Sequence, residues 1–280
     1  MAGGGLALSF AAMNIGVIGC GKMGTALVGG AVRAGAYASE QVMGFDPFPA
    51  AAEAFAAETG ATLRQDVAAM VAEADVVLLC VKPHLATSVL ADVSKDAAGG
   101  GKLVISVVAG ISLSILQGAV PPSWRVIRAM PNTPALVGQG ATAFCRGANA
   151  TDEDAAEAMR MFASVGLAME VPEHLMDAVT GLSGSGPAYV FLCIEALADG
   201  GVAAGLPRDQ AMKLATQTLL GAATMVAQTG THPAVLKDAV ASPGGTTIAG
   251  IEALERGGLR ATLISAVRAA AQRANELSAG

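Results

Sequence analysis

The first 171 residues of the chain alternate short, almost wholly apolar runs with alanine-rich stretches, and no other feature limits the possible folds as strongly. The apolar runs are rich in β-branched residues, which favour strands; they read NIGVIG, QVMGFD, ADVVLLCV, KLVISVV, RVIRAM and ATAFCRG. Strands that are apolar on both faces are typical of a parallel sheet with helices packed on both sides. The sequence therefore predicts an α/β fold for this part of the chain.

Strand patterns end near Pro172, and the rest of the chain is predicted to be helical. The long periodic stretches are AYVFLCIEALADGGVAAG, RDQAMKLATQTLLGAATMVAQTG and LRATLISAVRAAAQRANEL. Their alanine content favours close contacts between helices. We interpret residues 1–13 as a disordered extension, with Met13 as a candidate native start, residues 14–172 as one domain and residues 173–280 as a second, helical domain.

Composition and charge argue against several kinds of partner. The 280-residue chain has a net charge of −6 and a pI near 5.1, which disfavours nucleic acid because phosphate binding requires a basic face. No run reaches the roughly 18 uninterrupted apolar residues expected of a membrane span. The opening MAGGGLALSFAA lacks the basic residue of a secretory signal. We expect neither a nucleic-acid nor a membrane partner.

The cysteines and histidines are scattered along the chain. Four cysteines without a CxxC pattern indicate reduced, mostly buried thiols and hence a cytoplasmic protein; they are Cys20, Cys80, Cys145 and Cys193. The three histidines form no spaced cluster, so no metal site is predicted; they are His84, His174 and His232.

The segment Gly19-Cys20-Gly21-Lys22-Met23-Gly24 has the pattern GxGxxG. It follows a predicted strand and opens a predicted helix from Lys22 to Ala36, which is the setting of a dinucleotide-binding turn. Gly19 would permit the tight turn, Gly21 would let a pyrophosphate approach the backbone, and Gly24 would let helix pack on strand. The N–H groups of the helix start would face the phosphates. The alternative is a purely structural turn.

Asp46 ends the second predicted strand, 22 residues after Gly24. A carboxylate there can accept hydrogen bonds from a ribose 2′-OH and would repel a 2′-phosphate, so taken alone it favours NADH over NADPH. The alternative is a turn or helix-cap aspartate before Pro47.

Three further loops follow predicted strands and carry groups that could line a site. The first loop is VKPH (Val81 to His84), with Lys82 at a strand end and Pro83 at a helix start. The second is VVAG (Val107 to Gly110), which has small residues. The third is MPNTP (Met130 to Pro134), in which two prolines flank an asparagine amide and a threonine hydroxyl. Ligands of open α/β sheets bind at the carboxyl ends of the strands. Each loop could also be an ordinary turn.

Two glycine-rich segments lie in the helical part. GLSGSGPAYVF (Gly181 to Phe191) could form a backbone-donor concavity or a hinge into a helix. SPGGTT (Ser242 to Thr247) precedes the helical pattern TIAGIEALERGG; its exposed N–H groups would favour a carboxylate ligand, and Thr246 or Thr247 could instead cap the helix.

These motifs resemble the pyrroline-5-carboxylate reductase family. IGCGKMG, VKPH, MPNTP, LSGSGPAY and SPGGTTIAGIEALERGG occur there in the same order, and the resemblance runs from about Asn14 to Leu277. It implies a Rossmann-type doubly wound sheet followed by an all-helical dimerisation domain that also binds substrate. It further implies reduction of 1-pyrroline-5-carboxylate to L-proline with NADPH or NADH, in a homodimer or a dimer-based higher oligomer.

The resemblance also implies roles for individual residues. In the family, the turn matching Ser242–Thr247 holds the substrate carboxylate, and the threonine matching Thr247 lies near the ring nitrogen. The predicted substrate-binding residues are Ser242, Gly244, Gly245, Thr246 and Thr247, with Thr247 the catalytic one. The predicted cofactor-binding residues are Ile18, Gly19, Cys20, Gly21, Lys22, Met23, Gly24, Asp46, Asp66, Cys80, Val81, Lys82, Pro83, Val107, Val108, Ala109 and Asn132.

The chain departs from the family pattern at two places, both on the cofactor side. Many members prefer NADPH and carry small polar or basic residues where this chain has FDPFP, and an adenosine-contacting asparagine of the family falls near Asp66. Two other readings remain: a reductase of the same architecture acting on another cyclic imine or a 2-hydroxy acid, and a non-enzymatic nucleotide-sensing or scaffold protein. A β-hydroxyacid dehydrogenase would carry a lysine on the interdomain helix, yet none follows Gly186 before Lys213.

Overall fold

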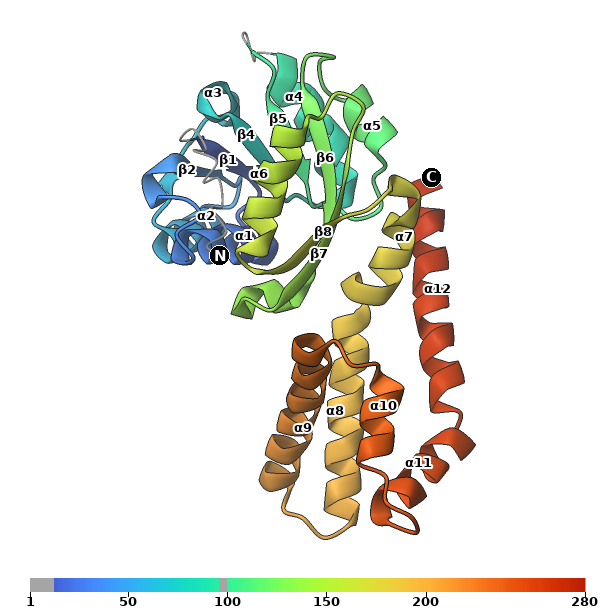
Figure 1. Ribbon diagram of the computed structural model, residues 1–280. Helices are drawn as coiled ribbons and strands as arrows, with labels where there is room; N and C mark the ends of the chain where they lie inside the picture. Colours follow the sequence, from blue (N-terminus) through green and yellow to red (C-terminus); the bar gives the residue numbers. More distant parts are fainter. Residues whose placement is uncertain (1–12, 96–99, 280) are drawn as a thin grey trace, which may run out of the picture. The chain divides into compact units, whose positions relative to one another are not determined.

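The computed structural model describes residues 13–95 and 100–279 (Figure 1). The chain forms two compact units. The first contains the residues up to 184 together with those from 271 onward, and the second contains residues 185–270. The domain boundary predicted at 172/173 stays a prediction, and all but one residue of the predicted extension 1–13 lie outside the described residues.

The first unit is built on one sheet with the strand order β3-β2-β1-β4-β5-β6-β7-β8. The strands are β1 (Ile15–Ile18), β2 (Val42–Phe45), β3 (Thr62–Leu63), β4 (Val76–Leu79), β5 (Leu103–Ser106), β6 (Arg125–Met130), β7 (Gly140–Arg146) and β8 (Gly166–Glu170). From β3 to β6 every neighbouring pair is parallel. The doubly wound, Rossmann-type sheet is confirmed.

The prediction of a parallel sheet is wrong for β7, the strand expected from ATAFCRG. β7 runs antiparallel to β6, with Met130 opposite Ala143, and β8 runs parallel to β7. Only residues 131–139 join β6 to β7, whereas a parallel crossover needs about a dozen residues or more. Strands β3 and β8 were not predicted, because TL is too short and GLAME too poor in β-branched residues to read as strands.

Helices cover both faces of the sheet. In the first unit they are α1 (Lys22–Arg33), α2 (Pro49–Thr59), α3 (Val67–Glu73), α4 (Ala86–Lys95), α5 (Leu113–Gly118), α6 (Asp152–Ala163) and α7 (Met176–Val179). Helix α1 is shorter than the predicted Lys22–Ala36, because Gly35 at φ 72° leaves the helical conformation.

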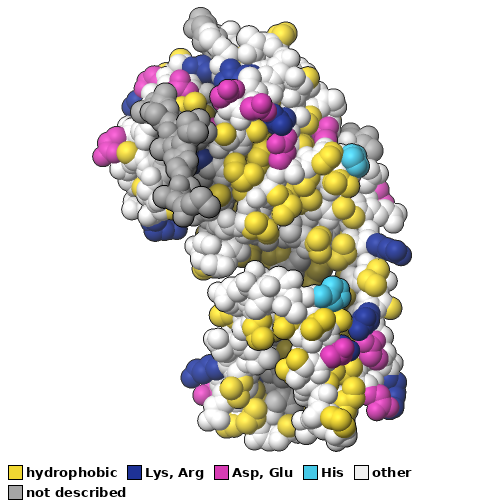
Figure 2. All heavy atoms as spheres, viewed as in Figure 1, with side chains coloured by type: hydrophobic (Ala, Val, Ile, Leu, Met, Phe, Trp, Pro, Cys, Tyr) yellow, Lys and Arg dark blue, Asp and Glu magenta, His cyan; other side chains and the backbone are white. Residues whose placement is uncertain are grey.

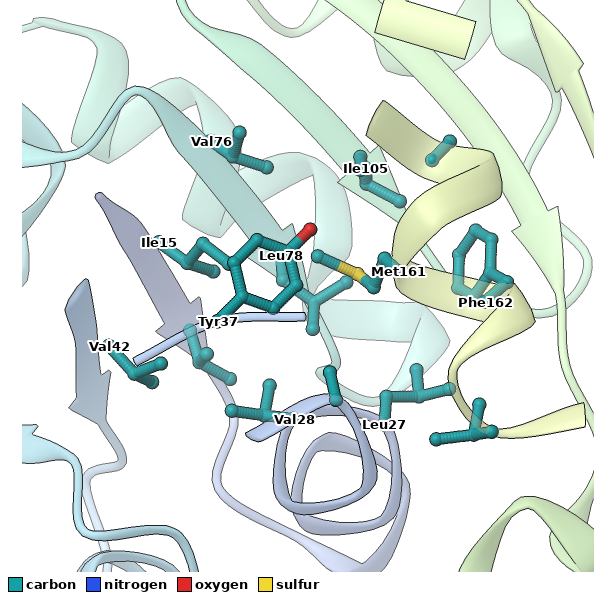
Figure 3. Close-up of a cluster of buried hydrophobic side chains, with 14 of the residues drawn as sticks. Ile15, Leu27, Val28, Tyr37, Val42, Val76, Leu78, Ile105, Met161 and Phe162 are labelled. Atoms are coloured by element: carbon teal, nitrogen blue, oxygen red, sulfur yellow. The ribbon is translucent and has the colours of Figure 1, made fainter. Parts of the chain in front are cut away.

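Alternate residues of the strands enter two separate apolar cores. Val76 and Leu78 of β4 belong to one cluster, and Val77 and Leu79 belong to the other. The first cluster lies between the sheet, α1 and α6, where Leu27 and other labelled side chains converge (Figure 3). Both faces of β4 are therefore buried, which explains why its sequence is apolar throughout.

The second unit is helical throughout. It contains α8 (Gly186–Ala203), α9 (Arg208–Thr229), α10 (Pro233–Ala239), α11 (Thr246–Arg256) and the larger part of α12 (Leu259–Ala279). Helices α8 and α9 meet at three buried alanines, Ala198, Ala211 and Ala215, as the alanine-rich pattern predicts.

Much of the apolar surface of the second unit is exposed. Phe191 is 62% exposed and Leu192 64%, and both line a groove of about 470 Å³ on α8 and α9. Figure 2 shows further apolar side chains on the visible face of this unit. Among the described residues, the helical stretch Glu173–Ala203 is long and apolar enough to cross a membrane by length and composition alone, with 6% of its apolar window buried.

Candidate active site

The glycine-rich loop after β1 forms a cradle whose three glycines serve different purposes. Gly19 has φ 98°, and a Cβ there would lie 2.7 Å from the carbonyl oxygen of Cys80; a Cβ on Gly24 would lie 2.7 Å from the carbonyl oxygen of Gly19. Gly21, by contrast, has an ordinary extended backbone, and its Cβ would meet no protein atom within 4 Å. The fold itself requires Gly19 and Gly24, whereas Gly21 leaves space in front of the loop.

Helix α1 directs unpaired N–H groups into that space. Its N-cap is Gly21, which supplies no side-chain acceptor, and no acidic residue lies in its first turn. The first N–H groups of a helix have no acceptor within the helix, and the positive end of its dipole attracts anions. The open space at Gly21 together with these donors fits a pyrophosphate.

Asp46 lies directly beside this loop. Its Oδ2 accepts a hydrogen bond of 2.9 Å from the N–H of Cys20, and its Oδ1 accepts one of 2.9 Å from the N–H of Phe48. The bond to Phe48 is the turn role that the sequence left open, and the bond to Cys20 ties β2 to the glycine cradle. Because two carboxylate oxygens offer about four acceptor positions, Asp46 retains the capacity to accept ribose hydroxyls.

The two thiols near the cradle are not ionised at neutral pH. Burial, reinforced by the negative charge of Asp46, raises the pKa of the Cys20 thiol to about 12. Burial likewise raises the pKa of the Cys80 thiol. Neither thiol has the character of a nucleophile, so any part that these residues take in binding is through packing and backbone.

The predicted loops meet along one edge of the sheet. Val81 and Lys82 follow β4, Val107 to Ala109 follow β5, and Asn132 follows β6. These three strands are adjacent and parallel, so their carboxyl ends share an edge with that of β1. Lys82 is exposed there, and Pro83 begins a short 3₁₀ turn that leads into α4. The adenosine half of a dinucleotide would then lie toward β2, and the nicotinamide half toward β4–β6.

Two of the predicted cofactor residues are engaged within the protein. Asp66 is the N-cap of α3, and its Oδ1 accepts hydrogen bonds from the N–H groups of Ala68 and Ala69. Asn132 is only 8% exposed, and both ends of its amide are bonded to backbone groups. Sequence reasoning gave no sign of either set of partners. Whether either residue also contacts a cofactor stays a prediction.

The Ser242–Thr247 turn belongs to the second unit. The N–H of Gly245 donates to the carbonyl of Ser242 at 3.0 Å, and Gly244 has φ 66°, so proline and glycine occupy the central positions of a tight turn. The N-cap of α11 is Gly245, and no side chain caps this helix. The idea that Thr246 or Thr247 caps α11 is therefore wrong, since both lie inside its first turn.

This arrangement leaves the start of α11 suited to an anion. Its first N–H groups lack intrahelical acceptors, and the hydroxyls of Thr246 and Thr247 stand in the same turn. A Cβ on Gly245 would lie 2.5 Å from Oγ of Ser242, whereas one on Gly244 would meet no protein atom within 4 Å. The donors and the positive end of the helix dipole favour a small anion such as a carboxylate at this open turn.

Comparison with known proteins identifies close relatives along nearly the whole chain. Residues 173–277 match the family described as pyrroline-5-carboxylate reductase dimerisation, and residues 14–110 match the one described as NADP oxidoreductase, coenzyme F420-dependent. The chain is 49% identical to the pyrroline-5-carboxylate reductase of Glycine max over 269 residues, which cover 95% of this chain and 96% of that protein.

Solved structures agree. A pyrroline-5-carboxylate reductase from Coxiella burnetii superposes with a TM-score of 0.90 at 35% identity, covering 96% of this chain and 99% of that one. The Plasmodium falciparum pyrroline carboxylate reductase with NADP bound has a TM-score of 0.85 at 32% identity, covering 95% and 98%.

Proposed function

This chain belongs to the pyrroline-5-carboxylate reductase family, and we propose that its glycine cradle and its Ser242–Thr247 turn serve that family's reaction. The chain is an oxidoreductase that reduces 1-pyrroline-5-carboxylate to L-proline with NAD(P)H, the last step of proline biosynthesis. The assignment of the cofactor half rests on the open space at Gly21. A Cβ there would meet no protein atom within 4 Å, so the packing of the protein does not itself require a glycine at this position.

The cofactor half consists of the cradle and the strand ends beside it. The N–H groups at the start of α1 bind the pyrophosphate, and Asp46 accepts from the adenosine ribose. The Plasmodium relative was solved with NADP bound, which supports the use of a nicotinamide dinucleotide. When bound, the nicotinamide supplies a hydride to the imine carbon.

The substrate half is the start of α11. The backbone N–H groups and the hydroxyl of Thr246 hold the substrate carboxylate, and the Thr247 hydroxyl bonds the ring nitrogen. A protonated cyclic imine already accepts hydride readily, so these residues need only hold the ring and its nitrogen in place. This explains how an acidic chain can bind an anionic substrate without a cluster of basic side chains.

The proposed activity is tested by adding 1-pyrroline-5-carboxylate to the purified chain with NADH and, separately, with NADPH. Oxidation of the cofactor should depend on the substrate, and the product should be L-proline by chromatography. A folded sample that stays inactive with both cofactors would contradict the assignment.

Asp46 should set the preference between the two cofactors. Replacing it by Ser (Asp46→Ser) removes a charge that repels a 2′-phosphate and an acceptor for the ribose diol. A charge-assisted hydrogen bond contributes about 1.5–3 kcal/mol, so the NADPH/NADH ratio of kcat/KM should rise at least about tenfold. Asp46→Asn keeps an oxygen for the Cys20 or Phe48 amide and serves as the control for loop geometry. If the NADPH/NADH ratio of kcat/KM were unchanged in both variants, Asp46 would serve only to hold the turn through its bonds to Cys20 and Phe48.

We also propose that the chain is a homodimer, which buries the apolar face of α8 and α9. The match of residues 173–277 to a dimerisation family supports self-association, and the exposed Phe191 and Leu192 supply the apolar surface that an obligate interface needs. The same burial explains an apolar α8 without a membrane. The cytoplasmic location stays a prediction.

Phe191→Glu should therefore shift the chain from dimer to monomer in sedimentation velocity. A matched control is Phe48→Glu, which makes the same change at a phenylalanine that is 73% exposed in the first unit. The control should sediment like the unmodified chain. A Phe191→Glu protein that remains fully dimeric would place the interface elsewhere.

A further inference from the structure

Three alternate residues of β6 and its continuation, Arg128, Met130 and Asn132, share one face of the sheet, because side chains along an extended strand alternate. All three contact the segment 173–184, which ends in a π-helical turn, Thr180–Gly184. Single π-helical turns are rare and frequently occur at functional sites. The whole arrangement lies within the first unit.

The first contact fixes the beginning of this segment. The guanidinium of Arg128, 7% exposed in its side chain, lies 3.1 Å from the Glu173 carboxylate and 3.9 Å from that of Asp177. Glu173 also accepts a hydrogen bond of 2.6 Å from the N–H of Leu113. Arg128 is buried, but the side chains of Glu173 and Asp177 remain 37% and 25% exposed, so these ion pairs orient the start of the segment against the sheet and contribute only modestly to stability.

The other two contacts fix the end of the π-helical turn. Gly184 lies so close to Met130 that a Cβ would come within 2.6 Å of its Cε. The Asn132 amide donates from Nδ2 to the carbonyl of Ser183 at 2.9 Å, while its Oδ1 accepts from the N–H of Ala141 at 2.8 Å.

The bond to Ala141 continues the pairing between β6 and β7. Met130 lies opposite Ala143, so the next pair in the same alternation would be Asn132 and Ala141. Here the side-chain oxygen of Asn132 takes the place of a backbone carbonyl. The side-chain nitrogen is thereby held at a fixed position and aimed at Ser183.

We propose that Asn132 is a positioning residue, which holds the π-helical turn Thr180–Gly184 at the nicotinamide end of the cofactor edge, rather than a ligand of the cofactor. This inference rests on the proposed function, because hydride transfer requires that the backbone beside the nicotinamide stay at a fixed position. A displacement of about 1 Å at a reacting centre can cost about a hundredfold in rate.

The decisive variant is Asn132→Asp. It keeps an oxygen for the Ala141 N–H but faces the Ser183 carbonyl with a second oxygen in place of the donor. We expect kcat to fall by about 10- to 100-fold and the NADPH Kd, measured by calorimetry, to stay within about twofold. The kinetic isotope effect with NADPH deuterated at the transferred position should rise, and hydrogen–deuterium exchange should increase at residues 180–184.

Asn149→Asp is the matched control. Its Nδ2 also donates to a backbone carbonyl, that of Pro122 at 3.0 Å, but on an exposed loop that precedes α6. This control should match the unmodified chain in rate, affinity and exchange. Equal losses in the two variants would show a general effect of the charge and overturn the proposal.

A second variant decides the matter if Asn132→Asp does not fold. Asn132→Ala removes the donor to the Ser183 carbonyl without adding a charge, and it should also slow hydride transfer without changing NADPH affinity. A folded, fully active Asn132→Ala protein would overturn the proposal. The proposal would also be overturned if Asn132→Asp raised the NADPH Kd at least about tenfold and left kcat unchanged at saturating cofactor. That result would show that Asn132 is a ligand of the cofactor.

The exchange measurement separates this proposal from the proposed function. If the unmodified chain does not reduce 1-pyrroline-5-carboxylate, the function fails, yet exchange at residues 180–184 still reports whether Asn132 holds the turn. If the unmodified chain is active and exchange does not change in Asn132→Asp, only the positioning role fails.

Discussion

A Gly21→Val protein should fold normally and lose the binding of both NADPH and NADH. Valine can adopt the extended backbone of Gly21, and its Cβ meets no protein atom within 4 Å, so the cost to folding is small. The side chain would instead fill the space in which the pyrophosphate approaches the start of α1. Losing two charge-assisted hydrogen bonds, at about 1.5 kcal/mol each, weakens binding more than about 100-fold.

Calorimetric titration of each cofactor, with a melting curve on the same sample, measures both parts of this expectation. Gly118→Val is the matched control, because a Cβ at Gly118 also meets no atom within 4 Å and the residue lies at the exposed end of α5. The control should bind both cofactors normally. Retained affinity in Gly21→Val would mean that the phosphates lie away from the cradle.

A Thr247→Ala protein should lose most of its turnover and keep its cofactor affinity. The hydroxyl is proposed to bond the ring nitrogen, and a bond that strengthens as the hydride arrives can be worth about 3 kcal/mol, or roughly a hundredfold in kcat. A bond equally strong before and during the reaction would contribute about 0.5–1.5 kcal/mol, which predicts a smaller loss. Steady-state kinetics at saturating cofactor distinguishes the two magnitudes.

The melting temperature of Thr247→Ala distinguishes a catalytic role from a capping role. Loss of a capping hydroxyl would cost about 1 kcal/mol, but the N-cap of α11 is Gly245, so the melting temperature of Thr247→Ala should not change. Thr247→Ser keeps the hydroxyl and should recover most of the rate. Thr262→Ala makes the same truncation at an exposed threonine of α12 and should be fully active. A fully active Thr247→Ala protein would remove Thr247 from the chemistry.

The cofactor cradle was predictable because its signal is local. Gly19, Gly21 and Gly24 lie within six residues of each other, between an apolar run and a helical one, and the backbone conformations that they permit are decided by neighbouring atoms. The same holds for the tight turn at Pro243 and Gly244. Sequence-local sterics therefore predicted both turns, whereas the substrate role proposed for the second turn came from the family resemblance.

The direction of β7 was missed although the sequence carried a signal for it, because the segment 131–139 is too short for a parallel crossover. The partners of Asn132 were not predictable, since its residue type is equally compatible with a ligand contact and with a bond to the backbone of Ser183. The capping of α11 by Gly245 was missed because two threonines nearby offered a more usual cap.

The sequence by itself determined most of the strands and helices, the division of the chain into a sheet-forming part and a helical part, and the turns that its glycines and prolines require. These depend on contacts between residues close together along the chain. Only the tertiary structure decided that Asp46 ties β2 to the cradle and that Arg128, Met130 and Asn132 jointly hold the segment 173–184. These features join residues tens of positions apart, and such contacts are fixed by the packing of the whole sheet rather than by local preference.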